Sequence, residues 1–219
     1  MRGLLKNNIY ATLLSGKIFA AFICFAGIII VGVISQSLLA AYGLIAYGLM
    51  GTVGFSVCAL IAVKKEFSSK WGKYKLTLPV KRTDIIKSQF WNQLIWLFVG
   101  VVFAGTGIGL SWLFHGCLFD QPLDILMLFT LGISVSLLMG ALYFPAFYLF
   151  GEERGEIILL IALLCAFGLD CMLVGIINNL FAPGTAAMII GAAILFLCSL
   201  SAFSASCPLT IWVYNRKEY

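Results

Sequence analysis

The sequence predicts an all-α integral membrane protein with six transmembrane helices. Of its 219 residues, 62% are hydrophobic and only 11% are charged, whereas a soluble domain is about 45–50% apolar and about 25% charged. The mean hydropathy is +1.07. The apolar residues also form runs of the length that a helix needs to cross a bilayer, about 20 residues. A chain this apolar cannot cover a water-soluble surface, which excludes a cytoplasmic enzyme, a secreted domain and a disordered regulator.

The uncharged run 18–63 begins the membrane part of the chain. It is far longer than the apolar region of a signal peptide, about 7–15 residues, so it holds two spans, with a turn at Ser35-Gln36-Ser37. Before it, Leu5, Ile9 and Leu13 are spaced as on one helix face, which predicts an interfacial helix over about 2–14. The predicted spans are residues 18–35, 41–63, 91–114, 125–150, 157–178 and 185–214.

The basic residues predict the orientation. With six spans, all 14 of them fall on one side of the membrane, in segments 1–17, 64–90, 151–156 and 215–219. The opposite loops, 115–124 and 179–184, contain neither Lys nor Arg. Because positive residues stay in the cytoplasm, we expect a multi-pass protein of the cell membrane with both termini cytoplasmic. The net charge of +5 is explained by this asymmetry and by contacts of the basic residues with membrane lipids. We therefore expect no nucleic-acid partner.

The chain lacks the common motifs of catalysis. Ser15-Gly16-Lys17 has no upstream glycine and is not a GxxxxGK[ST] phosphate-binding loop. The single His115 cannot form HExxH or a histidine-rich metal site, and no GxSxG is present. We therefore expect no catalytic residue and no metal site. The seven cysteines form no CxxC pair and are expected to be small buried apolar residues.

Asp170 lies well inside the fifth predicted span, past its midpoint. An acid within the membrane is costly and is a functional candidate by default. It could line a substrate path or relay protons. It could also be a protonated acid bonded to a neighbouring helix, or one that reaches water at the outer end. No basic residue within the spans could pair with it.

Glycines are frequent in the spans. Gly48, Gly51 and Gly54 recur every three residues on the second span, and Gly105 and Gly109 form a GxxxG in the third. Small residues let membrane helices approach closely. Both patterns predict helix packing, within one chain or between two.

The loop between the second and third spans contains apolar residues with the spacing of one helix face, which predicts an amphipathic helix. Pro79 ends this pattern because the residue before a proline leaves the helical region, and Thr83 and Asp84 then predict the start of a helix that continues into the third span. A basic amphipathic helix can lie on anionic lipid or insert into a groove on a partner protein. Its apolar stripe is Phe67, Trp71, Tyr74 and Leu78.

The segment Trp71–Ser88, WGKYKLTLPVKRTDIIKS, resembles the cytoplasmic loop of ABC type-2 transporter permeases. The resemblance rests on an aromatic pair, a Leu-Pro-Val-x-Arg block and a helix start with two aliphatic residues and a serine. The chain's ending, IWVYNRKEY, is similar to the aromatic, basic and acidic tail of the family. The residues of the loop that carry the resemblance are Trp71, Tyr74, 78–82, Ile85, Ile86 and Ser88.

This resemblance implies a single transmembrane domain, 1–219, which pairs with a second permease chain as a homo- or heterodimer. Each chain would bind a separate ABC ATPase subunit, which holds ATP and Mg, through a coupling helix between spans 2 and 3. Phenol-soluble-modulin exporter permeases are similar, so the implied role is export of an amphipathic or hydrophobic substrate, such as a peptide. The implied ATPase contacts are Glu66, Phe67, Lys70, Trp71, Lys73 and Tyr74.

Two other functions stay open at this point. An ion- or proton-coupled secondary transporter would use Asp170 as its coupling group and would need no ATPase. A membrane-embedded enzyme would need a histidine cluster or a nucleophile motif, and the sequence has neither.

Overall fold

The computed structural model describes residues 2–33, 38–69, 82–115, 122–180 and 184–216. Within these ranges every regular element is helical and there is no strand, which confirms the all-α prediction. The elements are α1 (Arg2–Val33), α2 (Leu38–Ser68), α4 (Arg82–His115), α5 (Pro122–Phe150), the 3-10 turn η1 (Glu152–Arg154), α6 (Gly155–Leu180) and α7 (Thr185–Arg216).

Five helices contain stretches that are long and apolar enough to cross a membrane. The first predicted span, 18–35, belongs to α1 and lies partly outside the described residues, so six spans remain a prediction. The five stretches are Tyr42–Ser68, Thr83–Leu113, Leu123–Phe150, Gly155–Ile177 and Met188–Arg216.

Helix α1 holds both the predicted interfacial segment, about 2–14, and the described part of the first predicted span. It runs from Arg2 to Val33 without a break. Gly16 lies inside this helix, where a glycine costs only about 1 kcal/mol relative to alanine. It also packs closely, because a Cβ at Gly16 would lie 2.6 Å from the ring of Trp96 on α4. Gly16 is therefore a point of close contact between α1 and α4.

The other helices begin and end close to the predicted positions. Helix α4 begins at Arg82 with Asp84 in its first turn and continues to His115, as the Thr83-Asp84 signal indicated. Gly151, at φ 90°, ends α5 in the left-handed conformation that favours glycine. Its N–H donates to the carbonyl of Phe147 at 3.0 Å. This turn reverses the chain, so that α6 runs back along α5.

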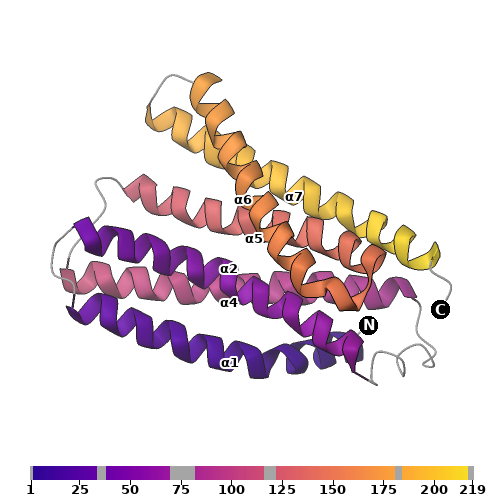
Figure 1. The fold of residues 1–219 in the computed structure, drawn as a ribbon. Coiled ribbons are helices and arrows are strands. Elements are labelled where there is room, and N and C mark those ends of the chain that lie inside the picture. The colour runs from indigo at the N-terminus through magenta and orange to yellow at the C-terminus, as the bar shows by residue number, and fades with distance from the viewer. Residues whose placement is uncertain (1, 34–37, 70–81, 116–121, 181–183, 217–219) are drawn as a thin grey trace.

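The helices form a bundle with α2 and α5 at its centre. Helices α1, α2 and α4 lie side by side, and α6 and α7 cover α5 on the far side from α1 (Figure 1). Two buried clusters fill the space between them. The smaller joins α1, α2 and α4 around Phe55 and Trp96. The larger joins α2, α4, α5, α6 and α7 and is rich in aromatic residues of α5, including Tyr143, Phe144, Phe147 and Tyr148.

Helices α1, α4 and α6 begin, and α2, α5 and α7 end, at the same end of the bundle (Figure 1). We call it the basic end. The start of α1 and the end of α7 thus lie together, as expected when a chain crosses a membrane an even number of times. That this end faces the cytoplasm is a prediction from the charge asymmetry. Described basic residues at this end are Lys6, Lys64, Lys65, Lys87, Arg154 and Arg216.

Candidate functional site

Phe67 lies at the end of α2 and is packed into the basic end. Its ring meets the rings of Phe147 and Tyr148 on α5 edge-on, with centroids 5.4 Å apart in both cases. The ring of Tyr148 in turn lies 5.0 Å from that of Tyr214 on α7. The aromatic side chain predicted to contact an ATPase therefore joins α2 to α5 within its own chain.

Glu66 is also directed into the bundle. It is only 8% exposed, and its Oε1 accepts a hydrogen bond from Nδ2 of Asn7 on α1 at 3.4 Å. The first two residues of the predicted ATPase contact thus bond and pack against α1 and α5. The remaining members of that set lie outside the described residues: Lys70, Trp71, Lys73 and Tyr74.

The start of α4 is tied to the same part of α1. Nδ2 of Asn8 donates to Oγ of Ser88 at 3.1 Å, and Nδ2 of Asn92 donates to Oγ1 of Thr12 at 3.2 Å. Segment 70–81 runs between the end of α2 and the start of α4, so α1 is hydrogen-bonded to the helices on both sides of it. These polar residues stand out in an otherwise apolar sequence, but their partners could not be predicted from it.

Helix α5 holds the start of α4 from the other side. Tyr148 Oη donates to Oε1 of Gln89, and Nε2 of Gln93 donates to the carbonyl of Ser136 at 2.9 Å. A further link, the ion pair between Lys64 of α2 and Glu156 of α6, lies at the surface, since the Glu156 side chain is 85% exposed. Because water screens such a pair, the buried bonds are the stronger connection.

Asp170 of α6 is buried against α5. It is 2% exposed, and Oγ of Ser134 donates to its Oδ1 at 2.7 Å. Its Oδ2 has no hydrogen-bond partner among the described residues. The arrangement matches the prediction of an acid bonded to a neighbouring helix. Within the described ranges no group of three or more His, Cys, Asp or Glu side chains could hold a metal ion.

A comparison with protein families identifies the chain. The family model described as "ABC-2 family transporter protein" matches residues 3–215. This chain belongs to the ABC-2 transporter family. No curated protein and no solved structure matches it. It is therefore the permease component of an ABC transporter, a multi-pass membrane protein, and the family implies association with an ABC ATPase subunit.

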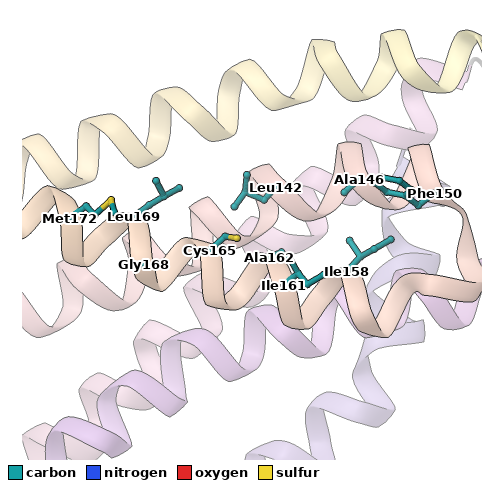
Figure 2. A pocket seen from close by; sticks show the side chains of 10 residues that line it. All are labelled: Leu142, Ala146, Phe150, Ile158, Ile161, Ala162, Cys165, Gly168, Leu169 and Met172. Atoms are coloured by element: carbon teal, nitrogen blue, oxygen red, sulfur yellow. The ribbon is translucent and has the colours of Figure 1, made fainter.

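The permease has an apolar groove of about 600 Å³ between α5 and α6. Figure 2 shows lining side chains from both helices, beginning near the basic end and extending along α6. With a thiol as its most polar side chain, the groove suits hydrocarbon and has no group for acid–base chemistry. Residues lining it include Leu142, Ala146, Phe150, Ile158, Cys165 and Met172.

The prediction that the cysteines are buried is wrong for several of them. Cys58 is buried, whereas Cys24, Cys165, Cys171 and Cys198 are exposed on the bundle surface. A thiol behaves as a small apolar group, so a surface that faces lipid accepts it as readily as a core does.

Proposed function

We propose that this permease is the transmembrane subunit of an ABC exporter. It moves an amphipathic or hydrophobic substrate, such as a peptide, out of the cell. A separate ATPase subunit that binds ATP and Mg supplies the energy. The observation that carries the proposal is that the end of α2 and the start of α4, which flank segment 70–81 in the sequence, are both hydrogen-bonded to α1, through Glu66 to Asn7 and through Ser88 to Asn8.

We infer that the residues of the predicted ATPase contact have two roles, docking of the ATPase and transmission of its movement to the bundle. Trp71 and Tyr74, with Lys70 and Lys73, dock the ATPase. Phe67 packs on α5 instead and transmits the movement of the docked segment, because a rigid ring contact carries displacement between helices. Glu66 has the corresponding role toward α1. When ATP closes the ATPase pair, the ends of α2 and α4 are displaced together, and the bundle switches between inward- and outward-facing states.

Two permease chains make up the transporter in this proposal, with both termini of each chain in the cytoplasm. The concentration of basic residues at one end of the bundle supports this orientation. The second chain is either another copy or a related permease, and each carries its own ATPase.

The apolar groove between α5 and α6 supports a hydrophobic or amphipathic cargo. It begins near the basic end, at Phe150 and Ile158, and reaches Met172. A hydrophobic substrate that enters from the inner leaflet of the bilayer would contact these side chains, and no charged group would have to leave water.

Reconstitution into proteoliposomes tests the function. The permease is combined with a P-loop ATPase that co-purifies with it, and movement of a fluorescent amphipathic peptide into inside-out vesicles is measured. We expect transport that requires hydrolysable ATP with Mg and that a proton gradient cannot replace. Gradient-driven transport by the permease alone would contradict the proposal and favour a carrier that uses Asp170.

A further inference from the structure

One face of α4 near the basic end carries buried polar groups that are only partly hydrogen-bonded within the described part of the chain. They are spaced i, i+3, i+4 and i+7, which places them on one side of the helix. The residues are Gln89, Asn92, Gln93 and Trp96, with exposures of 1%, 1%, 1% and 7%. Among the described residues, no hydrogen-bond partner exists for Gln89 Nε2, Asn92 Oδ1, Gln93 Oε1 or Trp96 Nε1.

These four side chains form two pairs that face different helices. Gln89 and Gln93 face α5, because Tyr148 Oη donates to Gln89 Oε1 and Gln93 Nε2 donates to the carbonyl of Ser136. A Cβ placed on Gly140 of α5 would lie 2.2 Å from the Gln93 amide. The first pair is therefore held at the contact between α4 and α5.

Asn92 and Trp96 face α1. Asn92 Nδ2 donates to Thr12 Oγ1 at 3.2 Å, and the Trp96 ring fills the space left by Gly16. Each pair therefore spans one helical turn. In each pair, one N–H donor and one oxygen acceptor have no hydrogen-bond partner in the ranges that the structure describes.

We propose that α4 binds two buried water molecules, one for each pair. The first accepts a hydrogen bond from Gln89 Nε2 and donates to Gln93 Oε1. The second accepts from Trp96 Nε1 and donates to Asn92 Oδ1. Side chains four residues apart on a helix lie about 5–6 Å apart at Cβ. Two hydrogen bonds of about 2.9 Å that meet at one oxygen bridge such a gap.

The chemistry of the pairs selects water over other ligands. Each pair offers one donor and one acceptor, and buried waters have about 2–4 polar partners. A cation is excluded because an N–H group cannot ligate it, and neither pair carries a charge that would bind an anion. The other atoms of the three amides already bond to α1 or α5, so those side chains cannot turn toward each other without breaking these bonds.

This inference is independent of the substrate and the direction of transport. It makes the start of α4 a hydrated contact with both α1 and α5. Water-mediated bonds are nearly as favourable as direct ones, and they can form again when the two surfaces shift.

Nuclear magnetic resonance of the full-length permease in lipid nanodiscs tests the proposal. The protein is deuterated and carries 15N in Trp and Gln. The Trp96 and Gln89 signals are assigned through Trp96→Phe and Gln89→Leu. We expect a cross-peak to water from the Trp96 indole N–H and from the Gln89 side-chain amide. If neither group has one in the unmodified protein, the proposal fails, whatever the variants do.

Two matched variants then separate the sites. Asn92→Leu should abolish the water cross-peak of Trp96 and keep that of Gln89, whereas Gln93→Leu should do the reverse. Both replace a buried amide in the same turn of α4, so each controls for the loss of packing in the other. Cross-peaks that persist in both variants, or that vanish together while the spectrum stays folded, would overturn the assignment of one water to each pair.

Discussion

The ring of Phe67, at the end of α2, packs edge-on against the ring of Tyr148 near the end of α5, with centroids 5.4 Å apart. Tyr148 also donates to Gln89 of α4 and lies against Tyr214 of α7. One side chain next to segment 70–81 thus reaches a residue that contacts two further helices. In the exporter that we propose, this is the route by which movement of the docked segment reaches the bundle.

Phe67→Ala tests whether this side chain belongs to the bundle. Truncating a fully buried phenylalanine costs about 3–5 kcal/mol, so the half-buried Phe67 should cost about 2 kcal/mol in unfolding free energy. We expect a lower melting temperature of the detergent-extracted permease. A melting temperature equal to that of the unmodified protein would contradict the contacts with Phe147 and Tyr148.

Trp71→Ala is the matching test of the docking role. If Trp71 contacts the ATPase, its removal should leave the melting temperature of the permease unchanged and uncouple ATP hydrolysis from transport. Both are measured in proteoliposomes that contain the ATPase. Normal complex formation together with normal substrate-stimulated hydrolysis would count against Trp71 as an anchor.

The bond between Asn8 and Ser88 predicts energetic coupling between α1 and α4. Hydrogen bonds between membrane helices are worth about 0.6 kcal/mol on average and at most about 1.7. A double-mutant cycle of Asn8→Ala and Ser88→Ala should give a coupling energy in this range. The control cycle pairs Asn8→Ala with Ser134→Ala, which lies at the contact with α6 and should be additive. Equal coupling in the two cycles would refute a direct bond.

Asp170→Asn distinguishes the exporter from a proton-coupled carrier. The amide oxygen of asparagine can still accept the hydrogen bond from Ser134, so the exporter account predicts that ATP-driven transport is retained. A carrier that needs a titrating carboxyl would lose transport.

Ser134→Ala should instead lower the stability of the permease by about 1–3 kcal/mol, because it leaves the buried carboxyl of Asp170 without its described donor.

Gly100→Ala tests a close approach of α2 and α4. A Cβ there would lie 2.6 Å from the carbonyl oxygen of Gly51, a backbone atom that cannot turn aside. We expect a loss of about 1–3 kcal/mol, typical of overpacking. The control is Gly109→Ala on the same helix, where no atom lies within 4 Å of the added Cβ. Equal melting temperatures for the two variants would contradict the packing.

The helices could be predicted because their signal is local. Some 20 consecutive apolar residues indicate a span whatever surrounds them, and the Thr83-Asp84 pair indicated the start of α4. The close contact between Gly16 and Trp96 could not be predicted, because Trp96 comes from a distant part of the chain. The contacts that other glycines make with neighbouring helices could not be predicted either. The Gly105-Gly109 motif has little packed against it, whereas Gly100, outside any motif, makes the close approach.

The candidate site could be predicted only in part. Helical spacing singled out Phe67 with Trp71 and Tyr74, but it could not show that Phe67 faces α5. The polar residues Asn7, Asn8 and Thr12 are visible in the sequence, yet their partners on α2 and α4 follow from tertiary packing. A pattern identifies a face of a helix, and only the fold decides what that face meets.

Affinity capture of the intact complex tests the central claim most directly. The tagged permease is expressed in its native host, extracted in detergent and captured through the tag, and the captured material is probed for a P-loop ATPase. We predict that one ATPase subunit is recovered for each unmodified permease chain. We predict that the ATPase is lost when Trp71 and Tyr74 are both replaced by alanine. Failure of the ATPase to bind the unmodified permease, or equal recovery with the double variant, would contradict the account.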